Sequence, residues 1–134
     1  EIYVGAYRGA WRAYDDAADA LSSAVASGRT VGVFTNGVRG MQQDKLDRTG
    51  LSHERVVLLS TVELGAAKPD PESYRLAGEA LGVGKPAEML MIGDSWANDV
   101  AGPIAAGWRA AYLARHGRLR EGAPNVATLG EIRF

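Results

Sequence analysis

The sequence has no cysteine among its 134 residues. This absence excludes disulfide bonds, thiolate nucleophiles and thiolate metal ligands together. It also fits a reducing compartment, so we expect a cytoplasmic protein. Long apolar runs are missing too, and none approaches the roughly 20 residues that a helix needs to cross a bilayer. We therefore expect no membrane partner.

The chain also has little net charge, a formal −1 at pH 7. A balance this close to zero gives no electrostatic reason to expect nucleic acid or an anionic membrane surface as a partner. The composition is 46% hydrophobic and 23% charged, as in ordinary globular proteins. The length suits one domain with a single core.

Four short apolar segments, several of them rich in β-branched residues and closed by turn residues, predict strands. They cover residues 30–35, 55–59, 89–92 and 108–113. Helical patterns at residues 38–49, 70–81 and 98–106 lie between them. Strands that alternate with helices predict an α/β fold, a three-layer Rossmann-like parallel sheet with helices on both faces.

The ends of the chain carry weaker signals. Residues 1–28 read as a helix broken near residues 14–16, because apolar residues recur at helical spacing from Ala17 and Gly28 is a natural helix stop. Residues 61–68 read as a loop. The tail reads as a loop with a short helix around residues 128–132.

Polar residues follow the predicted strands where each one ends. Thr35, Asp94 and Ser95 come directly after apolar runs, and Lys68 sits in the loop beyond another. In open parallel sheets the chemistry gathers at the carboxyl ends of the strands. We therefore expect these side chains to share one edge of the sheet.

Their residue types suit phosphoryl chemistry. Asp94 and Asp99 bracket a loop that leads into a helix, and two converging carboxylates form the oxygen-rich kind of site that magnesium prefers. The hydroxyl of Thr35 and the amide of Asn36 could hold phosphoryl oxygens, and Lys68 adds a cation. Phosphoryl transfer needs mainly positioning and charge neutralisation, which this set could provide.

Each signal also has a purely structural interpretation. Thr-Asn-Gly after a strand is often only a turn, and a Lys-Pro pair is most often solvated. The acids after residue 93 could be a helix cap and surface charges. Trp96 suits either a core or a pocket wall. The case for function depends on the order and spacing of the three signals together.

The three signals lie in the segments Val33-Phe34-Thr35-Asn36-Gly37, Lys68-Pro69-Asp70-Pro71, and Ile92-Gly93-Asp94-Ser95 with Asn98-Asp99-Val100-Ala101-Gly102. These segments resemble the second, third and fourth motifs of the haloacid dehalogenase superfamily. The resemblance is to the subgroup whose members have a helical cap. The resemblance implies that Thr35, Asn36 and Gly37 bind the phosphoryl group and that Lys68 holds the nucleophile and the phosphate. It implies Mg²⁺ as cofactor, with Asp94 as a ligand and Asp99 as a second acid of the metal site.

The first motif of that superfamily, an Asp-x-Asp at the end of the first strand, has no counterpart here. Asp15, Asp16 and Asp19 precede the second motif, but they lie in a helical stretch. The resemblance therefore implies that residues 1–12 are a remnant of the helical cap and that residues 13–134 are an incomplete α/β core. We expect the central strand, which carries the nucleophile, to lie between residues 30–35 and 89–92 and to come from residues outside this sequence.

The leading functional hypothesis is a magnesium-dependent phosphatase that acts on a small phosphorylated molecule through an aspartyl-phosphate. A 2-haloacid dehalogenase is the first alternative, but the resemblance argues against it because those enzymes typically lack the acid at Asp94. A non-catalytic module with the same fold is the second. A phosphoacceptor receiver domain is rejected, since its acidic pair comes first in the chain. For the 134 residues alone we expect no activity.

Overall fold

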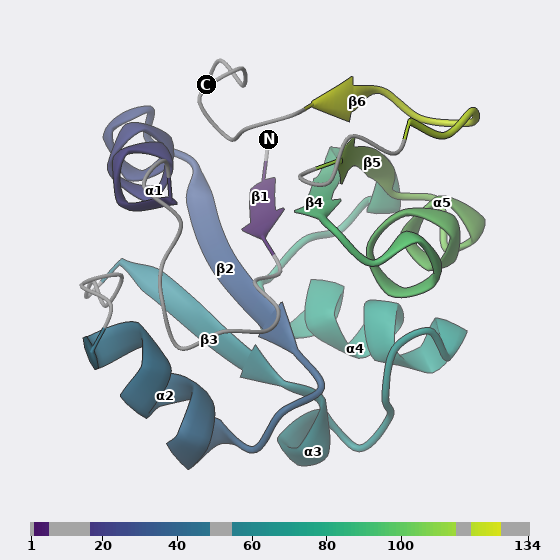
Figure 1. The fold of residues 1–134 in the computed structure, drawn as a ribbon. Helices are drawn as coiled ribbons and strands as arrows, with labels where there is room; N and C mark the ends of the chain where they lie inside the picture. The colour runs from purple at the N-terminus through teal and green to yellow at the C-terminus, as the bar shows by residue number, and fades with distance from the viewer. Residues whose placement is uncertain (1, 6–16, 49–54, 115–118, 127–134) are drawn as a thin grey trace.

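A computed structural model describes residues 2–5, 17–48, 55–114 and 119–126 of the chain. Its centre is a six-stranded sheet in the order β3-β2-β1-β4-β5-β6, and every neighbouring pair runs parallel (Figure 1). The strands are β1 (Ile2–Gly5), β2 (Thr30–Thr35), β3 (Val56–Ser60), β4 (Met89–Gly93), β5 (Arg109–Leu113) and β6 (Asn125–Val126). The predicted parallel sheet is confirmed.

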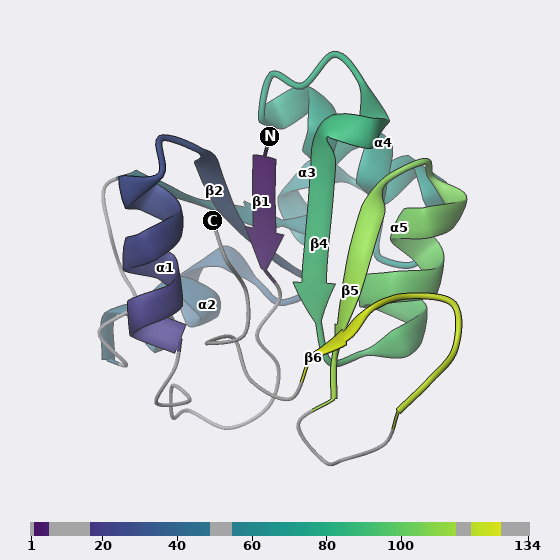
Figure 2. The same cartoon turned by 90° about the horizontal axis from the view of Figure 1, so that it is seen from above.

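Helices cover both faces of this sheet, as Figure 2 shows from above. They are α1 (Ala17–Ala26), α2 (Arg39–Arg48), α3 (Thr61–Leu64), α4 (Pro71–Ala80) and α5 (Gly102–Ala105), with a 3₁₀ turn, η1 (Pro86–Glu88), and a π-helix, η2 (Trp96–Ala101). α1 and α2 contribute to one apolar core, which contains Ala24, Val33, Leu46 and Ile92. α4 and η2 contribute to the other, which contains Phe34, Tyr74, Met91, Val100 and Trp108.

The central strand is the main correction to the sequence-based prediction. Residues 30–35 and 89–92 do flank a strand between them, but that strand is Ile2–Gly5 of this chain and not a segment from elsewhere. The helix and cap remnant expected at residues 1–12 is therefore wrong for residues 2–5; residues 6–16 lie outside the described part.

Residues 2–5 form a strand because a gap between β2 and β4 would be energetically costly. Without β1, the facing edges of β2 and β4 would leave buried N–H and C=O groups unpaired, at on the order of 1–3 kcal/mol each. Ile-Tyr-Val is a β-favouring run, and four residues are too few for periodicity to separate strand from helix.

Elsewhere the differences are local. Residues 61–64, expected in a loop, form α3. The helix expected at residues 98–106 is split into η2 and α5. β6 had no sequence signal, since it is two residues long, and the helix expected near 128–132 lies outside the described residues. Asp70 caps α4 as predicted, with its side chain accepting from the N–H of Glu72 and Pro71 in the first turn.

No helix in the described ranges is long and apolar enough to cross a membrane.

The role of β1 can be tested with a proline. Val4 lies inside the strand, paired with Gly32 on one side and Met91 on the other. Because proline removes the backbone N–H and leaves a buried partner unmet, Val4→Pro should lower the free energy of unfolding by about 1–3 kcal/mol. Val4→Ile keeps the N–H and the branched side chain, and should change it by under about 1.5 kcal/mol. Urea unfolding measures both; equal effects would remove residues 2–5 from the sheet.

Candidate active site

Lys68 is the buried cation at the carboxyl edge of the sheet. Its side chain is only 3% exposed, and its ammonium donates to the carbonyl of Phe34 at 2.9 Å and to Oδ1 of Asp99 at 3.0 Å. It also lies 4.9 Å from the centre of the Phe34 ring. The Lys68–Pro69 peptide bond is cis. Lys68 is therefore not the solvated lysine that its sequence context alone would suggest.

Asp99 balances that cation and is itself fully buried. Its second oxygen, Oδ2, accepts the backbone N–H of Ser95 at 3.0 Å. The carboxylate thus ties the loop after β4 to Lys68. The adjacent Gly93 is required, because a Cβ there would lie 2.3 Å from Oδ2 of Asp99.

Asn36 joins the loop after β2 to the segment that carries Lys68. Its amide donates to the carbonyl of Lys68 at 3.1 Å, and its Oδ1 accepts the N–H of Lys68 at 2.9 Å. The hydroxyl of Thr61 donates to the same Oδ1 at 3.0 Å. Asn36 thus positions Lys68 in this structure, and the phosphate-binding role that the resemblance implies for it stays a prediction.

Thr35 and Gly37 form the turn at the end of β2. The N–H of Gly37 donates to Oγ1 of Thr35 at 3.0 Å, and the buried Ser60 donates from Oγ to the carbonyl of Gly37 at 2.7 Å. Ser60 and Thr61 are not among the site residues that the sequence predicts. The signal was present, since both follow the apolar run of β3 just as Thr35 follows that of β2.

Asp94 differs from Asp99 in its contacts. Its Oδ1 is buried and has no hydrogen-bond partner within the described part of the chain. An unpaired buried carboxylate oxygen is costly unless it meets a cation or a donor. The two acids of the motif therefore have different surroundings: Asp99 faces Lys68 and Ser95, and Asp94 keeps an oxygen available.

The π-helix η2 is anchored from behind by Tyr74. The phenol donates to the carbonyl of Asn98 at 2.7 Å, next to Asp99. Burial, and secondly the negative charge of Asp99, raise the pKa of Tyr74 well above its usual range, so the phenol stays protonated and remains a donor. Gly102 lets the helix approach, since a Cβ there would lie 2.1 Å from the phenol oxygen. π-Helical turns are frequent at functional sites.

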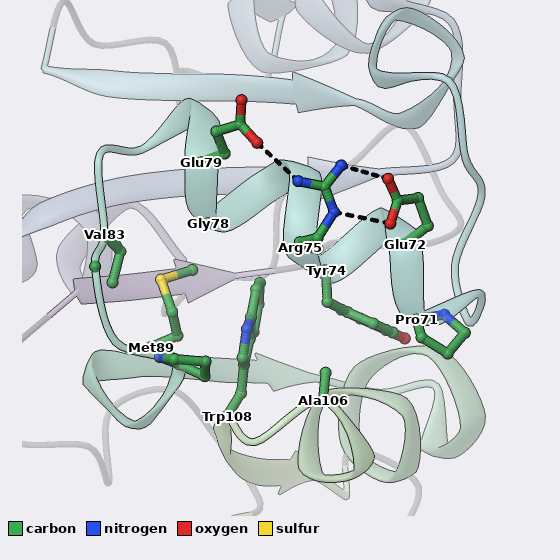
Figure 3. A pocket seen from close by; sticks show the side chains of 12 residues that line it. Pro71, Glu72, Tyr74, Arg75, Gly78, Glu79, Val83, Met89, Ala106 and Trp108 are labelled. Atoms are coloured by element: carbon green, nitrogen blue, oxygen red, sulfur yellow. Dashed lines mark hydrogen bonds and ion pairs between the residues drawn. The ribbon is translucent and has the colours of Figure 1, made fainter.

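A separate pocket of about 510 Å³ lies between α4 and the segments that lead into β4 and β5 (Figure 3). Met89 and Trp108 point toward α4, and Arg75 sits between Glu72 and Glu79 on the rim. The pocket faces the amino ends of β4 and β5. None of the predicted site residues lines it.

The fold and this edge define an α/β protein that gathers a hydroxyl, a lysine and two aspartates at the carboxyl ends of parallel strands. The profile of the haloacid dehalogenase-like hydrolases matches residues 2–107, most of the chain. The chain therefore belongs to the haloacid dehalogenase-like hydrolase superfamily.

Its relatives include both phosphatases and dehalogenases. A phosphoserine phosphatase of Thermus thermophilus is 39% identical over 102 residues, which cover 76% of this chain and 41% of the relative. The (S)-2-haloacid dehalogenase 4A of Burkholderia cepacia is 30% identical over 105 residues, which cover 78% and 45%. The chain thus spans less than half the length of these relatives.

A phosphatase of the same superfamily from Thermococcus onnurineus has a similar solved structure. Its TM-score is 0.79 with 32% identity, over 88% of this chain and 55% of that one.

The buried ion pair gives a prediction about stability. Asp99→Asn keeps the shape of the side chain but leaves the ammonium of Lys68 without its counter-charge, so the free energy of unfolding should fall by about 3–5 kcal/mol. Asp44, whose carboxylate pairs with Arg48 on the exposed surface of α2, provides the control. Asp44→Asn should change stability by less than about 1 kcal/mol. Urea titrations measure the free energy of unfolding of both variants. A similarly small loss in each would contradict a stabilising role for the buried ion pair.

Proposed function

We propose that this chain carries the phosphoryl- and metal-binding part of a magnesium-dependent phosphatase that acts on a small phosphate monoester. The observation that carries the proposal is the buried Oδ1 of Asp94, which has no hydrogen-bond partner among the described residues. The other two charges of the site, Lys68 and Asp99, pair with each other. A carboxylate oxygen left in this state suits a divalent cation. The phosphatases among the relatives support the substrate class.

In this proposal Asp94 is the direct magnesium ligand. Both oxygens of Asp99 already have protein partners, and the described residues contain no group of three or more acidic or histidine side chains that could hold a metal by themselves. Asp99 therefore acts in the metal site by fixing Lys68 and the loop after Gly93. Bound magnesium would supply positive charge against the phosphoryl oxygens.

The remaining residues bind and orient the phosphoryl group. The hydroxyl of Thr35, whose Oγ1 accepts the N–H of Gly37, would donate to a phosphoryl oxygen. Lys68 would contribute a fixed positive charge. Asn36 keeps Lys68 in place. Charge and donors held in advance at a buried edge favour a transition state in which negative charge is spread over the equatorial oxygens.

The nucleophilic aspartate is proposed to lie outside the 134 residues. β1 occupies the central position, yet Ile2–Gly5 has no carboxylate to offer. Attack by an aspartate would form an aspartyl-phosphate and release the alcohol, and water would then release phosphate.

A 2-haloacid dehalogenase remains the second candidate, because dehalogenases are also among the relatives. By the resemblance, however, 2-haloacid dehalogenases typically lack the acid that this chain has at Asp94. The buried oxygen of Asp94, which no described residue pairs, therefore favours the phosphatase. A non-catalytic module with this fold stays the third candidate.

Magnesium binding should depend on Asp94. Titrating Mg²⁺ into the wild-type chain and into Asp94→Asn by calorimetry should show at least tenfold weaker binding in the variant, because an amide lacks the negative charge that a hard cation prefers. Asp70→Asn, an exposed acid at the start of α4, is the matched control and should bind as wild type does. Equal affinity in the Asp94 variant would remove this residue from the metal site.

The purified 134-residue chain should not hydrolyse a chromogenic phosphate ester above background. Groups that position a phosphoryl group cannot replace the covalent step when no nucleophile is present. The measurement is p-nitrophenyl phosphate turnover with magnesium, with Thr35→Ala as the check for contaminants. Turnover that Thr35→Ala abolishes would place the nucleophile within these residues.

A further inference from the structure

Arg120 is an exposed cation placed at the carboxyl edge of the sheet. Its guanidinium carbon lies 4.5 Å from the centre of the Trp96 ring. Trp96 comes two residues after Asp94, so their Cα atoms are at most about 7 Å apart. Within the described residues no carboxylate forms an ion pair with Arg120. Among the described residues this guanidinium is thus a positive charge without an anionic partner, and it lies against the ring of a residue that follows Asp94 closely in the chain.

The loop that carries Arg120 has a defined structure. The side chain of Asn125 accepts the N–H of Arg120 at 3.0 Å and donates to the carbonyls of Arg120 and Ala123 at 2.7 and 2.9 Å. Asn125 belongs to β6, which pairs with the carboxyl end of β5. Figure 2 shows this segment passing the carboxyl ends of β4 and β5. The loop therefore holds Arg120 in place at the edge.

The Trp96 ring is held as well. It packs against the core around Tyr74 and Trp108, and it meets Tyr112 edge to face at 5.3 Å between centroids. Gly122, with φ of 109°, brings the loop to the same ring, where a Cβ would lie at an ordinary 3.7 Å. Arg120 covers one face of the ring, so a planar group such as a base could not stack on that face.

We propose that Arg120 determines substrate specificity by binding a second anionic group, a carboxylate or a further phosphate, on the leaving group of the substrate. A guanidinium presents a rigid fork of donors that matches both anions, and its stacking on Trp96 limits the side-chain entropy lost on binding. This inference rests on the proposed phosphatase function. It assigns to the same site a substrate with two anionic groups, and it disfavours leaving groups that are uncharged alcohols, nucleosides included.

The test compares two phosphate esters that differ in one carboxylate, 2-phosphoglycolate and ethyl phosphate. Each is titrated into the 134-residue chain with magnesium present, and binding is followed by the NMR shift of the Trp96 indole N–H, assigned with Trp96→Phe. The wild-type chain should bind 2-phosphoglycolate about tenfold more tightly, and Arg120→Gln should reduce that preference to twofold or less. Ethylene glycol bisphosphate distinguishes a preference for phosphate from one for carboxylate.

Two further variants separate this role from general charge effects and from misfolding. Arg120→Lys keeps the charge without the fork and should retain part of the preference, with greater sensitivity to salt. Lys85→Gln removes an exposed cation at the amino end of β4 and should keep the full tenfold preference. Equal wild-type affinity for the two esters, or a preference unchanged in Arg120→Gln, would overturn the role of Arg120 while leaving the phosphatase proposal standing. Failure of every ester to bind would overturn both.

Discussion

The buried pair of Lys68 and Asp99 is the interaction on which the candidate site depends. Two ions taken out of water are tolerated only when each meets the other and further donors or acceptors. Here the Phe34 carbonyl accepts from Lys68, and the Ser95 N–H donates to Asp99. The segments after β2, β3 and β4 must therefore meet at one place. The pair stabilises the fold only in this arrangement. It therefore specifies how the loops after β2, β3 and β4 lie.

Several neighbouring residues support the ion pair between Lys68 and Asp99. Gly93 leaves room for the carboxylate, Asn36 fixes the backbone of Lys68, and Tyr74 holds the π-helix on which Asp99 sits. With these contacts made, Asp94 is the acid in the described part of the chain that has a buried oxygen without a protein partner. The separation of roles is physical: one carboxylate neutralises the lysine, and the other stays available for a cation.

Many of the strands, helices and site residues could be predicted from the sequence, because their signals lie within a few neighbouring residues. The run at residues 30–35 and the Asp70-Pro71 helix start carry strong signals within a few residues, and both are confirmed. That Thr35, Lys68 and Asp94 share one edge could be predicted because the carboxyl ends of parallel strands lie at the same edge of a sheet. β1 could not be predicted, because four residues are too few to show the periodicity of a strand or a helix. Their strand conformation depends on hydrogen bonds to the facing edges of β2 and β4, which are distant in the sequence. The different contacts of Asp94 and Asp99 arise from tertiary packing, which spacing does not contain.

The proposal that the carboxyl edge binds magnesium and a phosphoryl group together can be tested with a crystal structure of the chain grown with magnesium and tungstate, a heavy analogue of phosphate. We expect an anomalous tungsten peak at the carboxyl edge, within hydrogen-bond reach of Thr35, with Mg²⁺ bound by Asp94 and with Lys68 still paired to Asp99. A tungstate bound only elsewhere, with the carboxyl edge empty of both ions and Asp94 paired to a protein donor, would contradict it.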